Sequence, residues 1–216
     1  MTFIFVFCLW IFSLCIHEYA HARVAFAGGD VTVEEKGYLS MNPLRYTDPV
    51  YSIIMPLLFL ALGGIGLPGG AVYIETNRLR SKAWKSAVSA AGPASNLLLA
   101  LFFGVIFWLV PHQDNQFWAA IAFVALLETT AVILNLLPIP PLDGYGILEP
   151  WLPASIRTHM RSFSRIGILV LFILLWYVDP VNDGFWTLVY TVTNALGVPS
   201  DLAWEGFRAF RFWKAQ

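Results

Sequence analysis

Charge is scarce in this chain of 216 residues. Only 12% of the residues are Asp, Glu, Lys or Arg, whereas soluble domains carry about a quarter, and 58% are hydrophobic. The net charge is −1 and no Lys- or Arg-rich run is present, so the sequence lacks the basic surface that binds nucleic acid. The composition therefore excludes nucleic acid as a partner and indicates a protein that is embedded in the lipid bilayer.

Cysteine and long polar stretches are also nearly absent. Cys8 and Cys15 are seven residues apart in one apolar run, about 10 Å along a helix, which is beyond the reach of a disulfide. That run has no positively charged start and no small-residue cleavage site, so we interpret it as a retained spanning helix and not as a signal peptide. Because there are no repeats and no separate polar segment, residues 1–216 are predicted to form one membrane-embedded domain.

Long apolar runs dominate the rest of the chain, and a helix needs about 20 mostly apolar residues to cross a bilayer. They predict spanning helices at 2–27, 84–110, 117–137 and 166–178 extended on either side, with a weaker candidate at 185–198. The run 50–67 contains one proline and three glycines, so it is poorly suited to a straight helix. We expect an all-α polytopic membrane protein with about 4–6 membrane segments and a re-entrant or short β-strand region between the first and second core helices.

Basic residues predict the orientation of the chain, because positively charged loops favour the cytoplasm. The thirteen Lys and Arg residues follow the first predicted helix, precede the second, follow the third and close the sequence. None lies before the first helix or in residues 111–116. Placing all thirteen on one side requires an external N-terminus and a re-entrant 50–67 segment. We therefore predict a multi-pass protein of the cell membrane in that orientation.

The first predicted helix contains the motif His17-Glu18-Tyr19-Ala20-His21. Residues four apart share one helix face, so both imidazoles can bind one metal ion, and Glu18 lies beside them as a candidate general base. In a soluble helix this pattern is about as often a solvated polar face. Here the sixteen residues before His17 are nearly all apolar, so the motif lies inside the membrane, where each ionisable group costs a few kcal/mol. Zinc binding, at roughly 10–16 kcal/mol, offsets this cost.

A protease zinc site takes three protein ligands and leaves the fourth position open. The best candidate for the third ligand is Asp143, because three prolines interrupt the helix just before this acid. Asp143-Gly144 could instead form an ordinary turn. Since the first and third predicted helices run in the same direction, Asp143 and the two histidines are expected near the cytoplasmic face of the membrane. One Zn²⁺ with ionised Glu18 and Asp143 is also formally neutral, which suits a buried site.

Together with Gly92-Pro93-Ala94-Ser95-Asn96 between them, these motifs resemble the site-2 protease family of intramembrane zinc metalloproteases. The pattern of that family is HExxH, then GPxxN, then a proline-rich segment that ends in DG. Residues 37–43 are similar to its short strand-forming loop, so the resemblance covers roughly residues 11–148. It implies a zinc endopeptidase that cleaves membrane-spanning proteins. Unlike many members, this sequence shows no spanning helix before the HExxH helix and no PDZ or CBS domain.

In this mechanism we expect Zn²⁺ to polarise the scissile carbonyl while Glu18 takes a proton from water and passes it to the leaving amine. Asn96 and Asn135 are candidate hydrogen-bond donors to the substrate or the oxyanion, with contacts between helices as an equal alternative. A helical substrate must unwind before it is cut, and residues 38–41 and 72–74 are candidate edges that hold it extended.

Glu128 lies near the middle of the third predicted helix, where an acid is a functional candidate by default. The interpretation that we favour is a neutral, hydrogen-bonded Glu beside Thr129 and Thr130. His112 and His159 lie in polar loops and are expected to be solvated.

Two other functions stay open at this point. A zinc-binding membrane transporter could line an ion path with the HExxH ligands and Glu128, although the other acids gather on one side. A catalytically inactive scaffold of the same family would bind membrane proteins without cutting them, but it would have no need of Glu18. A transmembrane protein or peptide within the lipid bilayer is the expected partner, and the sequence identifies neither that substrate nor the oligomeric state.

Overall fold

The computed structural model describes residues 2–45, 72–111, 115–211 and 213. No β-strand occurs among these residues, and the predicted all-α class is confirmed. The elements are α1 (Thr2–Gly28), α2 (Thr32–Glu35), η1 (Pro43–Arg45), α4 (Lys82–Leu109), α5 (Gln116–Asn135), α6 (Asp143–Leu148), η3 (Glu149–Trp151), α7 (Ala154–Tyr177), α8 (Asp179–Ala195) and α9 (Ser200–Phe210).

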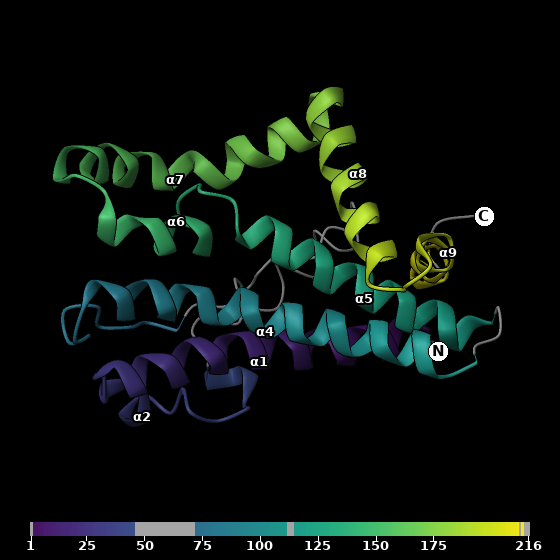
Figure 1. Ribbon diagram of the computed structural model, residues 1–216, viewed down its shortest axis with the longest axis horizontal. Coiled ribbons are helices and arrows are strands. Elements are labelled where there is room, and N and C mark those ends of the chain that lie inside the picture. The colour runs from purple at the N-terminus through teal and green to yellow at the C-terminus, as the bar shows by residue number, and fades with distance from the viewer. Residues whose placement is uncertain (1, 46–71, 112–114, 212, 214–216) are drawn as a thin grey trace.

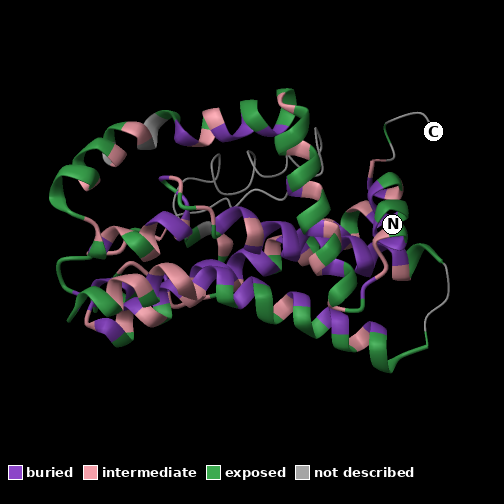
Figure 2. Ribbon diagram, turned by 45° about the horizontal axis from the view of Figure 1, so that its top comes forward, coloured by how far each residue is buried: buried purple, intermediate pink, exposed green. Residues whose placement is uncertain are grey.

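Helices α1, α4 and α5 lie side by side and form the centre of the protein (Figure 1). α1 and α5 run in one direction, and α4 runs in the other. α5 is the most enclosed of the three, since sixteen of its twenty residues are buried. A helix that is apolar around its whole circumference requires such surroundings. Figure 2 shows the buried residues concentrated in this central group, whereas α7 and α8 are mostly exposed or partly exposed.

Capping residues fix the ends of these helices. The side chain of Ser81 accepts a hydrogen bond from the first turn of α4, and the side chain of Asn115 does the same for α5. α1 ends at Gly28, and Gly29 follows it with a φ of +116°, a backbone conformation that favours glycine. The three predicted spans 2–27, 84–110 and 117–137 therefore correspond to α1, α4 and α5.

These three helices are the described segments that are individually long and apolar enough to cross a membrane. α7 and α8 meet at a bend of 93°, so Ile166–Tyr177 and Asp179–Ala195 together count as one broken span or a re-entrant pair. The described residues thus provide three spans, or four with the bent pair. They give no separate fifth span at 185–198, because this region is the second arm of the bend. The run 50–67 lies outside the described residues, so the count of 4–6 segments and the re-entry remain predictions.

The predicted strand at 38–41 is wrong, because these residues form turns. Gly37 has a φ of +75°, which reverses the chain so that the backbone N–H of Tyr38 donates to the carbonyl of Val33 at 2.9 Å. The hydroxyl of Ser40 then donates to the carbonyl of Gly37 at 2.8 Å. The second candidate edge, residues 72–74, has no regular secondary structure and pairs with no strand among the described residues.

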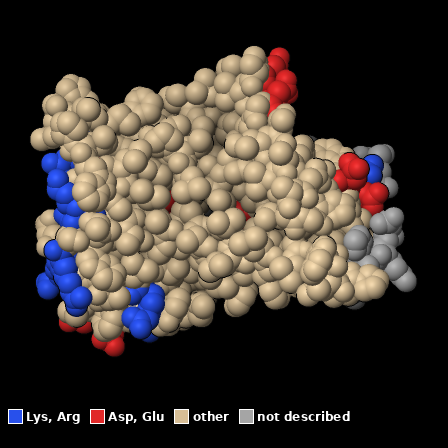
Figure 3. All heavy atoms as spheres, viewed as in Figure 1, with Lys and Arg blue, Asp and Glu red and all other residues tan. Residues whose placement is uncertain are grey.

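The prediction that all Lys and Arg residues share one side is wrong for Arg208 and Arg211. Most basic residues on the face shown in Figure 3 gather at the end of the bundle where α1 ends and α4 begins. α9 instead packs at the opposite end, where Phe210 stacks on Phe3 at the start of α1 with ring centroids 4.9 Å apart. The physical reason is close backbone contact: Gly206 lies against the carbonyl of Ala119, at a separation that no side chain would allow. Charge patterning carries no information about this packing.

Candidate metal centre

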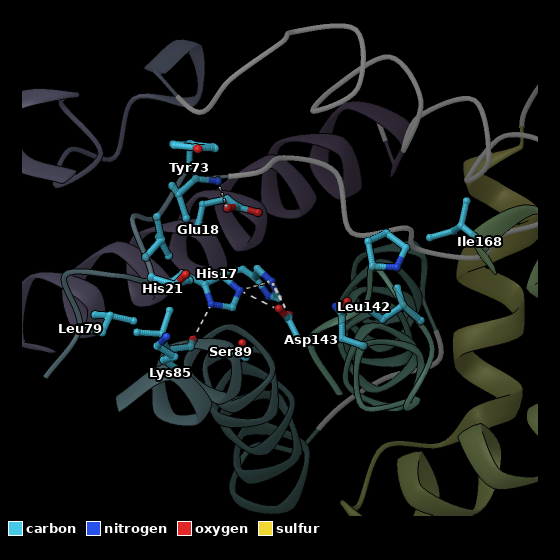
Figure 4. A pocket seen from close by; sticks show the side chains of 16 residues that line it. His17, Glu18, His21, Tyr73, Leu79, Lys85, Ser89, Leu142, Asp143 and Ile168 are labelled. Carbon is cyan, nitrogen blue, oxygen red and sulfur yellow. Dashed lines mark hydrogen bonds and ion pairs between the residues drawn. The ribbon is translucent and has the colours of Figure 1, made fainter. Parts of the chain in front are cut away.

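Two imidazoles and one carboxylate converge between α1 and α6 (Figure 4). His17 and His21 are one turn apart on α1 and both are buried, with their Nε2 atoms 3.0 Å apart. Oδ2 of Asp143 lies 3.3 Å from Nε2 of His17 and 3.4 Å from Nε2 of His21. The structure therefore brings together the three predicted ligands, which come from opposite ends of the predicted site region in the sequence.

The prolines after α5 bring Asp143 into this position. α5 ends at Asn135, and the chain turns through the proline-rich segment before α6 begins at Asp143 itself. Gly144 lies directly against the carbonyl of Leu136, so any side chain at this position would collide with the backbone at the end of α5. The hydroxyl of Ser86 on α4 donates to the carbonyl of Ile147 at 2.6 Å, which fixes α6 against α4.

The outer nitrogen of each imidazole is also hydrogen-bonded. Nδ1 of His21 lies 2.7 Å from the carbonyl oxygen of Val88, which can only accept, so this nitrogen carries the proton. Nδ1 of His17 lies 2.5 Å from Oδ1 of Asn96, and the same reasoning applies. In the neutral form that binds a metal ion, each imidazole then keeps its Nε2 lone pair free, and both lone pairs face the Asp143 carboxylate. In that form, three electron-rich atoms at this separation repel one another unless a cation lies between them.

The separations also fit zinc. Ligand atoms bound to a tetrahedral Zn²⁺ at about 2.0–2.2 Å are about 3.3–3.5 Å apart, and the distances from Asp143 to the two imidazoles lie in this range. A carboxylate must be ionised to bind a metal ion, and Asp143 presents its Oδ2 to both imidazoles.

Gly92 is a site residue that the sequence did not identify as such. It lies on α4 directly beside both imidazoles, and an added Cβ would be 2.5 Å from Nε2 of His17 and still closer to Nε2 of His21. α4 can approach the two ligands only because this position has no side chain. The GPxxN motif therefore contributes two things to the centre, close approach at Gly92 and a hydrogen bond at Asn96.

A pocket of about 530 Å³ opens from the three ligands. Glu18 lines it and is buried, and one of its carboxylate oxygens accepts a hydrogen bond from the backbone N–H of Val72 at 3.1 Å. Asn135 also lines the pocket, and its side-chain amide nitrogen has no partner among the described residues. Glu18 and Asn135 thus both offer polar atoms to a molecule that enters the pocket.

The segment 72–76 forms one wall of this pocket, and hydrogen bonds fix its outer side. Nζ of Lys36 donates to the carbonyl of Tyr73 at 3.1 Å, and the backbone N–H of Glu75 donates to Oδ2 of Asp30 at 2.7 Å. Asp30 is fully buried at the end of α1. The backbone N–H of Val72 points the other way, toward Glu18. The inner edge of the segment therefore faces the metal centre.

Ion pairs strengthen this anchor at its exposed end. Nε of Arg78 lies 2.6 Å from one carboxylate oxygen of Glu75, and Nζ of Lys36 lies 3.2 Å from the other. The hydrogen bond from Arg78, followed by that from Lys36, lowers the pKa of the Glu75 carboxyl. The sequence offers only a weak signal for this anchor, because Asp30 and the residue that it holds, Glu75, are 45 residues apart.

Three further candidates occupy different positions from the pocket-lining residues. Asn96 lies behind His17, and its amide nitrogen donates to Glu128 at 2.8 Å and to Ser13 at 3.2 Å, an arrangement that favours contacts between helices over contact with substrate. Glu128 contacts Asn96, whereas the hydroxyls of the neighbouring threonines donate to carbonyls of their own helix. His159 is exposed and bonds to the backbone of α7, and His112 lies outside the described residues.

Comparison with known proteins gives close relatives over nearly the whole chain. It is 46% identical to "Putative zinc metalloprotease Rip2" of Mycolicibacterium smegmatis, over 99% of this chain and 82% of that protein. The protein of the same name from Mycobacterium tuberculosis H37Rv is 42% identical over 98% of this chain and 82% of its own length. "Putative zinc metalloprotease YwhC" of Bacillus subtilis is 35% identical over 80% of each chain. No family model and no solved structure matches the chain.

These similarities agree with the ligand geometry. The three relatives carry the name putative zinc metalloprotease, and this chain contains an HExxH helix and an acid whose ligand atoms converge into one group that can hold a metal ion. The cofactor is Zn²⁺. The protein belongs to the family of zinc metalloproteases that includes Rip2 and YwhC.

Proposed function

We propose that this protein is an intramembrane endopeptidase of the site-2 protease type, which hydrolyses peptide bonds of membrane-spanning substrates. The observation that carries the proposal is the position of the ligands along a spanning helix. His17 lies eleven residues before the end of α1 at Gly28 (28 − 17), which is about 16 Å along a helix axis. The hydrocarbon layer is about 30 Å thick, so a site at this depth lies within the bilayer.

The pocket-lining residues support hydrolysis. When bound, Zn²⁺ supplies a Lewis acid that polarises a carbonyl and activates water. Glu18 is adjacent to His17 and exposes its carboxylate to the same pocket, so it can accept a proton from water and return it to the leaving amine. The unpaired amide nitrogen of Asn135 is a donor for the substrate carbonyl. Retention of the base distinguishes this proposal from that of an inactive scaffold.

The substrate class follows from the wall of the pocket. A membrane-spanning helix must expose its backbone before it is cut, and an extended protein segment can hold the unwound peptide by backbone hydrogen bonds. The inner edge of residues 72–74 faces Glu18, while Asp30 and Lys36 occupy the outer edge. We therefore assign the inner edge as the position of the substrate peptide.

The orientation in the cell membrane follows from the basic residues. Most basic residues on the face shown in Figure 3 gather near the end of α1 and the start of α4, and we assign this end to the cytoplasm. The N-terminus is then outside, and the metal centre lies toward the cytoplasmic side.

The experiment compares wild type with Glu18→Gln in proteoliposomes that contain a membrane-spanning reporter substrate. We expect Glu18→Gln to bind zinc normally and to cleave about 10²–10⁴-fold more slowly, because the base is lost while the ligands remain. Asp143→Asn is expected to retain less zinc. Glu34→Gln is the matched control, since Glu34 is an exposed acid on α2, and it should cleave normally.

A second substrate sharpens the test. The same scissile sequence in a soluble peptide should be cleaved much more slowly than in its membrane-spanning form. Full cleavage by Glu18→Gln would end the assignment of a protease mechanism. Preference for the soluble peptide would end the intramembrane part.

A further inference from the structure

We propose that Glu128 is a positioning residue of the metal centre. It orients the side-chain amide of Asn96, and that amide sets which nitrogen of His17 binds zinc. The inference rests on the metal centre and does not depend on whether the substrate spans the membrane.

The contacts run through three helices. Glu128 lies in α5 with 0% of its surface exposed, and its Oε2 accepts a hydrogen bond from Nδ2 of Asn96 in α4 at 2.8 Å. Oδ1 of Asn96 then lies 2.5 Å from Nδ1 of His17 in α1. Asn96 is itself buried, so no solvent competes for either end of its amide. Burying an acid at this depth is unfavourable, and a specific hydrogen-bonding role accounts for it.

An amide has one accepting end and one donating end, so its orientation decides what it offers to His17. Oε2 of Glu128 accepts a hydrogen bond whether the acid is ionised or is protonated on its other oxygen, Oε1. The donating end of Asn96 is therefore held toward Glu128, and the accepting end faces His17. Nδ1 of His17 must then carry the proton, and the Nε2 lone pair is left for the metal ion.

His21 does not share this dependence. Its Nδ1 faces the carbonyl of Val88, and a backbone carbonyl cannot rotate to present a donor. The Asn96 amide nitrogen also donates to the hydroxyl of Ser13 at 3.2 Å, but a hydroxyl can donate as well as accept, so Ser13 does not fix the orientation of the amide. Without an acceptor at position 128, the Asn96 amide can turn over, accept from Ser13 and donate to Nδ1 of His17. The proton would then move to Nε2, where it occupies the electron pair that zinc requires. The two histidines thus have the same role but differ in what fixes their tautomers.

Neighbouring residues on α5 provide controls. Thr129 and Thr130 are as buried as Glu128, but their hydroxyls donate to the carbonyls of Ala125 and Leu126 in the same helix. A change at Thr130 therefore disturbs the same region of α5 without touching Asn96.

The test measures the zinc affinity of purified protein in detergent by competition with a chromophoric chelator. Glu128→Leu is expected to bind zinc about 10–100-fold more weakly, the usual cost of losing an outer partner of a ligating histidine. Glu128→Gln retains an accepting oxygen and should stay within about threefold of wild type. Thr130→Val should match wild type. Thermal unfolding of the metal-free proteins checks that each variant folds.

A paired substitution separates orientation from packing. Asn96→Leu removes the amide itself, so no acceptor faces Nδ1 of His17, and it is expected to weaken zinc binding about as much as Glu128→Leu. Because Glu128 acts through this amide, the double variant Asn96→Leu/Glu128→Leu should bind zinc no more weakly than Asn96→Leu alone. Wild-type affinity in Glu128→Leu, or losses that add in the double variant, would overturn the inference.

Discussion

The two ends of the helix bundle differ in the kind of side chain that packs there. Around the metal centre, the polar side chains are imidazoles, acids and amides, all of them buried except the partly buried Asp143. We call His17, His21, Asn96, Glu128 and Asp143 the polar end. Where α9 crosses the first turns of α1 and α5, the contacts are aromatic, and we call Phe3, Phe123, Phe207 and Phe210 the aromatic end.

This difference predicts separate roles for the two ends, one in metal binding and one in stability. Buried polar groups lose their hydration and stabilise the fold only when every partner is in place, and here the last partner is the metal ion. Packed rings stabilise helix association by van der Waals contact and need no ligand. We therefore expect the polar end to determine zinc binding and activity and the aromatic end to determine stability. Each prediction below tests that division.

The largest effect is expected for Gly92→Ala at the polar end. The added Cβ would overlap Nε2 of both histidines, so zinc affinity should fall by about 100-fold or more, beyond the cost of losing one outer contact. Gly184→Ala is the control, because a Cβ there meets nothing within 4 Å. Zinc titration of both variants checks this, and normal binding by Gly92→Ala would show that α4 does not limit the centre.

Phe123→Ala should produce the opposite result. Phe123 is buried and contacts Phe207 and Phe210, so its truncation leaves a cavity and should lower the free energy of unfolding by about 3 kcal/mol, the low end of the range for such changes. Denaturation in mixed micelles measures this loss, and the folded variant should bind zinc as wild type does. Phe102→Ala, at a largely exposed position, should be close to neutral. A loss of zinc affinity in folded Phe123→Ala would contradict the division.

A smaller effect is expected for Asp30→Ala, at the anchor of segment 72–76. It removes a charge-assisted hydrogen bond to the backbone of Glu75, a contribution of about 1.5–3 kcal/mol, so KM should rise by about tenfold or more. Zinc affinity should not change, because no ligand is disturbed. Steady-state cleavage of the reporter provides the measurement. A fall in kcat at constant KM would instead assign Asp30 to the chemical step.

The smallest effect concerns Glu75. Its folded-state pKa lies below the ordinary value, so its ion pairs contribute stability above the unfolded-state pKa, and this contribution is lost as the pH falls through the folded-state pKa. The pairs are exposed, so the contribution is small and is screened by salt. Hydrogen exchange of the Glu75 amide should accelerate in acid in wild type relative to Glu75→Gln at low ionic strength. If the exchange rate depends on pH in the same way in both proteins, the ion pairs of Glu75 do not stabilise the anchor.

The ligands could be predicted from the sequence because each follows a local rule. Helical spacing pairs His17 with His21, and three prolines before Asp143 signal a break that ends in an acid. The three long spans follow from apolar length alone. These features depend on neighbours in the chain, and the structure matches them within a few residues.

The rest depends on contacts that no local pattern encodes. The hydrogen bonds of Asn96 form only when α1, α4 and α5 are packed together. The sequence alone favours neither contact with the substrate nor contact between helices for this residue. The position of α9 was missed because it follows from Gly206 fitting against Ala119, whereas its basic residues suggested the other side. The turn at Gly37 was read as a strand because a positive φ at one glycine changes the path of the residues after it.

The anchor of segment 72–76 connects residues outside the spanning helices to the pocket between them. Lys36 and Glu75 meet outside the spanning helices, yet the backbone that they fix ends at Val72, whose N–H contacts Glu18 at the pocket. Under the proposed intramembrane function, a change made in the aqueous phase, such as neutralising Lys36, is thereby transmitted to the pocket within the bilayer. A soluble factor could govern such a reaction without ever entering the bilayer.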